Sequence, residues 1–195
     1  MNSSADAPID DIADLTVADR IDALLPQTQC RRCGFDGCRP YAQAVASGAA
    51  AINRCPPGGS AGIAALAALL GCESLPLDRE CGSEDDPGVA WIDAQACIGC
   101  ARCLPPCPVD AIVGAQRYLH TVLESRCNGC QLCLSSCPVD CIVMRPRAAG
   151  GTAPTAAENR SRYESHRERT QHSARALAAL LAERKRLAAA GSGSQ

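Results

Sequence analysis

Large aromatic side chains are scarce in this sequence. Aromatic residues make up 3% of the 195 positions, with Phe35 as the only Phe and Trp91 as the only Trp. A chain with so few bulky side chains has little material for an ordinary hydrophobic core. Small proteins of this kind are commonly stabilised by disulfides or bound metals, and the 15 cysteines supply thiols for either.

Long apolar runs are also lacking. The longest, residues 63–70, is far shorter than the ~20 apolar residues of a spanning helix. The first 25 residues carry six Asp, whereas a signal peptide needs a positive start and an apolar run. We therefore expect no transmembrane segment and a cytoplasmic, reducing compartment, where clustered cysteines bind metal more often than they pair.

Charge is distributed unevenly along the chain. The formal net charge is -2, but residues 1–95 carry -8, residues 96–145 carry +1 and residues 146–195 carry +5. The total charge therefore dictates no partner, and the acidic front and the basic tail are expected to meet different neighbours.

Shifts in composition and the positions of Gly and Pro divide the chain into six segments. Apolar periodicity predicts short helices near residues 16–25, 41–50 and 61–70, and one long, isolated helix over 157–190. We predict a disordered N-terminus (1–15), a four-cysteine domain (16–81), a linker (82–88), an eight-cysteine domain (89–147), a second linker (148–156) and a basic Ala/Arg-rich helical tail (157–195).

The eight-cysteine domain is an internal repeat of 30 residues. Cys97, Cys100, Cys103 and Cys107 recur as Cys127, Cys130, Cys133 and Cys137, each copy reading C-x2-C-x2-C-x3-C-P. A cubane iron–sulfur cluster needs four converging thiolates, three of which one tight loop can supply. All-cysteine zinc sites also use C-x2-C pairs, but they lack the third closely spaced cysteine, so the repeat favours iron and sulfide. We expect apolar residues to shield the clusters, namely Ile98, Ile112, Leu132, Ile142 and Val143.

The first cysteine group has a different spacing. Cys30, Cys33, Cys38 and Cys55 read C-x2-C-x4-C-x16-C, with Pro56 after the last cysteine. This spacing alone is compatible with zinc or with an iron–sulfur cluster.

The wider pattern resembles a known family. The repeat is similar to bacterial two-cluster ferredoxins, in which the fourth cysteine of each copy ligates the other cluster. The segments 25–41 and 52–59 resemble the N-terminal cluster domain of the B subunit of Rnf-type electron transport complexes, and the domain order matches. The resemblance covers about residues 16–147. It implies three [4Fe–4S] clusters, held by Cys30, Cys33, Cys38 and Cys55; by Cys97, Cys100, Cys103 and Cys137; and by Cys107, Cys127, Cys130 and Cys133. The implied fold is α+β: a small helical iron–sulfur domain, a two-cluster ferredoxin-like domain and a C-terminal helical tail.

The resemblance also implies a function. Rnf-type complexes are ion-translocating and pass electrons between ferredoxin and NAD, so the implied partners are other redox subunits, ferredoxin or flavoproteins. The implied place is the cytoplasmic face of the bacterial inner membrane. Typical B subunits begin with a membrane-spanning helix, which this sequence lacks, so we expect a peripheral variant. We expect an electron carrier with no catalytic site of its own. The alternatives are a free soluble ferredoxin serving cytoplasmic oxidoreductases, and a structural metal module.

The remaining polar and sulfur-bearing residues are given ordinary roles. Cys141 is expected to pack beside a cluster, and Cys72 and Cys81 to be free thiols rather than a redox pair. Asp110 and Asp140 are expected to cap or face solvent, and three histidines to be exposed, namely His120, His166 and His172. The basic tail is either a solvated helix or a docking element for anionic lipid or an acidic redox partner. Nucleic-acid binding is disfavoured, because no aromatic residues interleave with the arginines.

Overall fold

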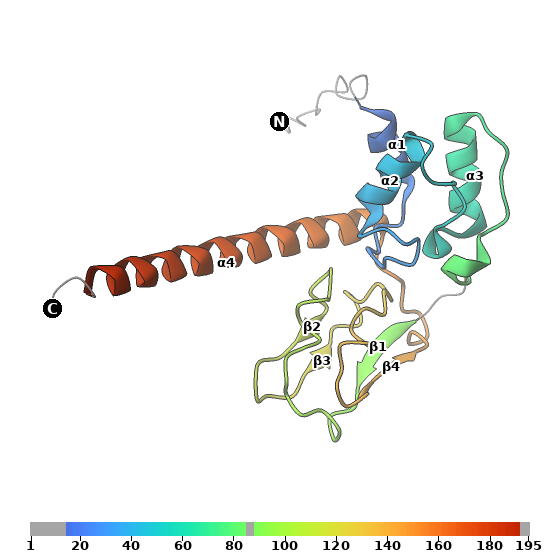
Figure 1. Cartoon of the computed structure of the whole chain (residues 1–195). Coiled ribbons are helices and arrows are strands. Elements are labelled where there is room, and N and C mark those ends of the chain that lie inside the picture. The colour runs from blue at the N-terminus through green and yellow to red at the C-terminus, as the bar shows by residue number, and fades with distance from the viewer. Residues whose placement is uncertain (1–14, 85–87, 192–195) are drawn as a thin grey trace, which may run out of the picture.

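The computed structural model describes residues 15–84 and 88–191. A unit of three short helices lies beside a unit of small antiparallel sheets, and one long helix leaves the body of the molecule (Figure 1). The predicted α+β class with a C-terminal helix is therefore confirmed. The predicted disordered N-terminus, apart from Leu15, lies outside the described residues, as do the middle of the 82–88 linker and the last four residues of the tail.

The helical unit consists of α1 (Val17–Leu24), α2 (Cys38–Ala46) and α3 (Gly59–Leu70), with short 3-10 turns η2 (Pro56–Gly58) and η3 (Arg79–Cys81). Thr16 and Asp19 form a capping box that begins α1. Helix α2 begins at the third cysteine and ends earlier than predicted, since Gly48 lies in the left-handed region at φ 74°.

The three helices bury a compact apolar core. Helix α1 packs against α2 and α3, and the most deeply buried side chains include Ile21, Tyr41, Ile63 and Leu66. Cys33, Cys38 and Cys55 belong to the same buried cluster. The first cysteine group is therefore built into the side of a helical core.

The repeat folds into two interlocked antiparallel ribbons. Strand β1 (Val89–Ile92) pairs with β4 (Ile142–Arg145), and β2 (Ile112–Val113) pairs with β3 (Thr121–Val122). Strands β1 and β3 precede the cysteines of the first and second copy, whereas β2 and β4 follow them. The ribbon of β1 and β4 thus joins the start of the first copy to the end of the second, so neither copy forms a folded unit alone.

Helix α4 (Ala156–Gly191) confirms the predicted long helix, but its first half is not isolated. Asn159 is buried and its Nδ2 donates to the Pro26 carbonyl at 3.1 Å, while Arg160 pairs with Asp22 at 2.6 Å. Further along, His166 and Arg169 both contact Asp110 of the sheet unit. The first four turns of α4 therefore tie the two cysteine-bearing units together.

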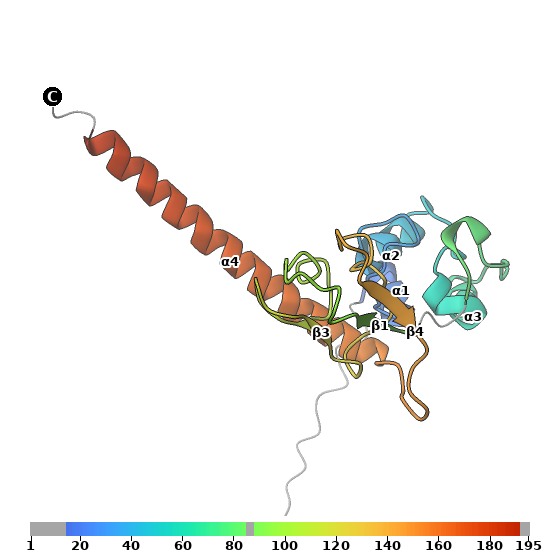
Figure 2. The ribbon, with the colours of Figure 1, turned by 90° about the horizontal axis from the view of Figure 1, so that it is seen from below.

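The second half of α4 projects away from the body in two perpendicular views (Figures 1 and 2). Its side chains from Gln171 to Ala188 are all exposed. Among the residues that the structure describes, no helix combines the length and apolar character needed to cross a membrane.

Candidate metal centres

Four thiols line one cavity of the sheet unit, here named the Cys97 cavity. Its cysteines are Cys97, Cys100, Cys103 and Cys137. Three of these thiols come from the loop after β1, and the fourth comes from the second copy of the repeat. The other lining side chains are mainly apolar, including Ile92 and Ile142.

A second cavity, the Cys127 cavity, has the complementary set. Its cysteines are Cys107, Cys127, Cys130 and Cys133. Within the described ranges, no three or more His, Cys, Asp or Glu side chains meet closely enough to chelate a single metal ion. The thiols instead surround a space, which is the arrangement that a multi-iron cluster requires. Each cavity combines three cysteines of one copy with the fourth cysteine of the other.

The backbone of the two loops repeats as closely as the sequence does. Gly99 and Gly129 lie at φ 67° and 73°, and Ala101 and Gln131 lie at 60° and 66°. Left-handed residues alternating with right-handed ones turn successive N–H groups toward one side of a loop, which creates an anion-binding concavity. These loops are therefore shaped to receive a negatively charged group among the thiols.

Backbone N–H groups reach the sulfur atoms directly. The Ala111 N–H donates to Cys107 Sγ at 3.2 Å, and the Ala90 N–H donates to Cys127 Sγ at 3.5 Å. Burial raises the pKa of Cys137, but this is outweighed by backbone N–H groups including those of Val139 and Cys141, so its pKa is lowered. Such donors stabilise thiolate ligands and the negative charge of a cluster bound to them.

Burial and repulsion from neighbouring cysteines raise the pKa of two thiols of the Cys127 cavity, that of Cys133 to about 12 and that of Cys130 further still. Metal ligation requires thiolates, so loading of these sites releases protons.

The first cysteine group also converges. Cys33, Cys38 and Cys55 share one buried cluster. Burial, together with repulsion from neighbouring thiols that include Cys30 and Cys33, raises the pKa of Cys38 and of Cys55 to about 12, which accords with four thiols that lie near one another. A fifth thiol, Cys81, is buried nearby and donates to Asp78 at 3.7 Å.

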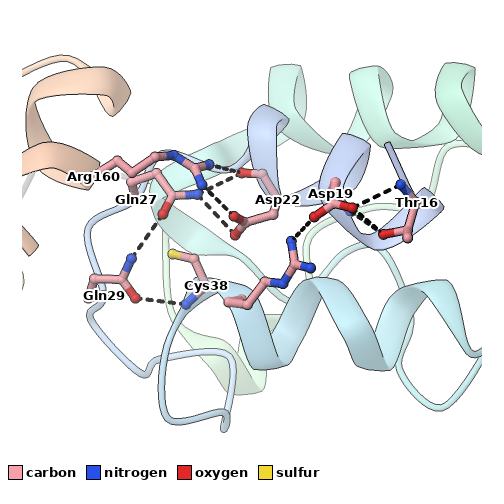
Figure 3. A network of polar contacts seen from close by, with 8 residues as sticks. Thr16, Asp19, Asp22, Gln27, Gln29, Cys38 and Arg160 are labelled. Atoms are coloured by element: carbon pink, nitrogen blue, oxygen red, sulfur yellow. Dashed lines mark hydrogen bonds and ion pairs between the residues drawn. The ribbon is translucent and has the colours of Figure 1, made fainter. Parts of the chain in front are cut away.

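A buried chain of polar contacts links this group to the tail (Figure 3). Arg160 of α4 donates to the Asp22 carboxylate at 2.6 Å and to its backbone carbonyl at 2.9 Å. Gln27 donates to the same carbonyl, and Gln29 donates to Gln27 at 2.9 Å. The carboxamide oxygen of Gln29 then accepts the N–H of Cys38 at 2.9 Å. The loop that carries Cys30 is thus held by Asp22, Gln27 and Gln29, each at most 4% exposed. Arg160 connects these buried side chains to α4 from a partly exposed position.

The expected exposure to solvent is wrong for two of the three histidines. His120 is 4% exposed, lines the Cys97 cavity, and its Nδ1 lies 3.6 Å from Cys97 Sγ. His166 is half-buried because it contacts Asp110 at 2.8 Å. The Asp110 carboxylate therefore binds a side chain of α4 instead of taking the expected capping role. His172 is exposed as expected.

The expected shielding is confirmed only in part. Ile112 and Ile142 are buried, and Leu132 is half-buried, but Ile98 is 61% exposed and Val143 is 44% exposed. Val143 alternates with Ile142 along β4, so it faces the opposite side of the ribbon. Ile98 lies in the loop at the rim of the Cys97 cavity.

The unassigned cysteines lie in three different environments. Cys72 is exposed and Cys81 is buried, and both are free thiols. Cys141 is buried beside the Cys97 cavity, as expected, with its Sγ 3.5 Å from Cys137 Sγ.

Comparisons with known proteins agree with this geometry. Residues 90–144 match a family model described as "4Fe-4S dicluster domain", and residues 25–57 match one described as "Putative Fe-S cluster". The chain is 60% identical over 110 residues to the B subunit of the ion-translocating oxidoreductase complex of Alkalilimnicola ehrlichii, a match that covers 56% of this chain and 59% of that protein. The predicted resemblance to Rnf B subunits is confirmed.

Two further relatives carry the same name. Identity is 58% over 108 residues to the protein of Azoarcus sp. (55% of this chain, 59% of that protein), and 58% over 107 residues to that of Thiobacillus denitrificans (55% and 57%). The chain thus matches a little over half the length of these curated relatives. No solved structure matches it.

Proposed function

We propose that this chain binds three [4Fe–4S] clusters through twelve cysteines and acts as the B-type electron-transfer subunit of an Rnf-like complex. The first cluster is assigned to Cys30, Cys33, Cys38 and Cys55. The second is assigned to the four cysteines of the Cys97 cavity, and the third to those of the Cys127 cavity. When bound, such clusters accept and release single electrons.

The observation that carries this proposal is the crossed composition of the two cavities. Each contains three thiols of one copy and the fourth thiol of the other, with backbone N–H groups directed at sulfur. This arrangement fits the donor chemistry of two cubanes. The burial of Cys33, Cys38 and Cys55 in one cluster, with the half-buried Cys30 close enough to repel the Cys38 and Cys55 thiolates, supports a third site.

The protein side chains bind, shield and space the sites. Asn128, beside two cysteines of the Cys127 cavity, donates from Nδ2 to the Thr28 carbonyl at 3.2 Å. Thr28 lies two residues before Cys30, so this contact places the first cysteine group next to the Cys127 cavity. Close spacing of redox sites is what a single-electron carrier needs.

Iron and sulfide content tests the proposal directly. The anaerobically purified chain is expected to contain about twelve irons and about twelve sulfides, and to give paramagnetic signals after dithionite reduction. About eight of each, with zinc in the helical unit, would contradict the third site. A colourless protein without sulfide would favour the structural metal module and refute the electron-transfer proposal.

The proposed partners are the other redox subunits of the complex, with ferredoxin or a flavoprotein as donor or acceptor, and the proposed place is the cytoplasmic face of the inner membrane. The relatives named above are all subunits of a complex, which favours this assignment over a free ferredoxin.

We also propose that the second half of α4, from Gln171 onward, docks on anionic lipid. Four exposed leucines lie there beside Arg175, Arg184, Lys185 and Arg186; the leucines are Leu177, Leu180, Leu181 and Leu187. Basic side chains near a negatively charged bilayer contribute about 1 kcal/mol each, and salt screens this attraction.

Co-sedimentation with vesicles tests this docking. The full chain is expected to sediment with phosphatidylglycerol vesicles at low salt, and not with phosphatidylcholine vesicles or at high salt. Removal of residues 171–195 spares the contacts that Asn159, Arg160, His166 and Arg169 make with the body and is expected to abolish sedimentation. Equal sedimentation of the full and shortened chains would contradict the role of the tail.

A further inference from the structure

The two thiol-lined cavities are built from equivalent positions of the repeat. Each of the ten residues that line the Cys97 cavity has its counterpart, 30 positions away, among those that line the Cys127 cavity. Each cavity can therefore be compared directly with the other, and a difference in side chains at equivalent positions distinguishes the two sites.

The first difference is His120, which stands where the other copy has Ala90. Its Nδ1 lies 3.6 Å from Cys97 Sγ, and its Nε2 is buried with no hydrogen-bond partner in the described part of the chain. A ligating thiolate only accepts hydrogen bonds, so Nδ1 must carry the hydrogen when Cys97 binds metal. Gly114 makes room for the ring, since a Cβ added there would lie 2.4 Å from His120 Cδ2.

The second difference is Cys141, which stands where the other copy has Ala111. It is not one of the four assigned ligands, and its Sγ lies 3.5 Å from Cys137 Sγ. A thiol that does not ligate metal keeps its hydrogen, so Cys141 is an S–H donor beside the Cys137 thiolate.

Two polar side chains line the Cys127 cavity, Asn128 and Gln131, and in the described part of the chain neither donates a hydrogen bond to a cysteine sulfur. Asn128 uses Nδ2 on the Thr28 carbonyl and uses Oδ1 to accept the Cys130 N–H. The counterpart of Asn128 is Ile98, which is 61% exposed, whereas Asn128 is 8% exposed. The Cys97 cavity is thus richer in side-chain donors to sulfur and closer to water.

The additional side-chain donors of the Cys97 cavity and its greater exposure to water both affect the reduction potential in the same direction. Reduction adds negative charge to a cluster and its thiolates, and hydrogen bonds to sulfur and exposure to water stabilise that charge. We infer that His120 and Cys141 give the cluster held by Cys97, Cys100, Cys103 and Cys137 a higher reduction potential than the cluster held by Cys107, Cys127, Cys130 and Cys133. This inference rests on the proposed binding of a cluster in each cavity.

A redox titration of the full anaerobic chain, followed by electron paramagnetic resonance, tests the inference. The two ferredoxin-type midpoints are expected to be resolved, and the Cys97→Ala/Cys137→Ala variant is expected to lose the higher one. His120→Ala and Cys141→Ala should each lower that midpoint and leave the other unchanged, and the double variant should shift it further. Ala111→Cys should raise the lower midpoint.

Three controls separate donation from structure. His120→Asn keeps an N–H near the position of Nδ1 and should restore most of the potential that His120→Ala loses. His172→Ala and Cys72→Ala remove an exposed imidazole and an exposed thiol and should shift neither midpoint. Full iron content with unshifted midpoints in the His120 and Cys141 variants would overturn the inference, as would a shift of the lower midpoint. A wild-type chain without clusters would refute the proposed function instead.

Discussion

Replacing Cys97 and Cys137 together by alanine is expected to remove one cluster, whereas replacing Cys97 and Cys107 together is expected to remove two. The reason is the crossed lining of the cavities, in which Cys97 shares a site with Cys137 of the other copy and not with its own copy's fourth cysteine. Iron analysis should therefore give about eight irons for the first double variant and about four for the second, against about twelve in the unmodified chain.

The uncrossed arrangement predicts the opposite order, since Cys97 and Cys107 would then belong to one cluster. That reversal would contradict the assignment without disputing that the chain binds clusters. Cys72→Ala/Cys141→Ala removes two thiols that are not assigned as ligands and serves as the matched control. It is expected to retain about twelve irons.

The three closely spaced thiols proposed for each ferredoxin-type site can be grouped from the sequence because their information is local. Three of the four thiols of each ferredoxin-type site lie within seven consecutive residues, and the same spacing occurs twice in the chain. The long helix was also predictable, because Ala, Leu, Arg and Glu favour helix over its whole length. Neither inference required knowledge of which segments meet in space.

The contacts of α4 could not be predicted in this way. Arg160 and Asp22 are 138 positions apart, and His166 and Asp110 are 56 apart. In the sequence each is an ordinary charged or titratable residue in a polar stretch. Only the tertiary fold brings them together, so an interpretation based on composition treats the helix as isolated.

His120 shows a signal that the sequence already contains. Superimposing the two copies places it opposite Ala90, just as Cys141 stands opposite Ala111. A departure from an internal repeat marks a position where the two halves differ in environment or function. His120 and Cys141 both line the Cys97 cavity, so the two departures from the repeat concern the same site.

Removing iron and sulfide is expected to unfold the sheet unit while the helical unit retains part of its structure. Five of the twelve residues in the buried core of the sheet unit are cysteines, and its strands are only two or four residues long. Isolated two-stranded sheets are marginal in water. Metal ligation at structural sites contributes about 10–16 kcal/mol, on the scale known for zinc, which exceeds the net stability of most small domains.

Hydrogen exchange of the anaerobically chelated chain is the decisive measurement. Amides in residues 88–147 should lose protection, whereas those of α1, α2 and α3 should keep more, because only three of the twelve residues in the buried core of the helical unit are cysteines. Helix α4 should also lose its hold on the sheet unit, since Asp110 would no longer be presented to His166 and Arg169. Reconstitution with iron and sulfide should restore protection throughout. If the chelated chain instead kept a cooperative thermal transition and full protection over residues 88–147, the clusters would not be what holds this unit together, and its small apolar core would have to suffice.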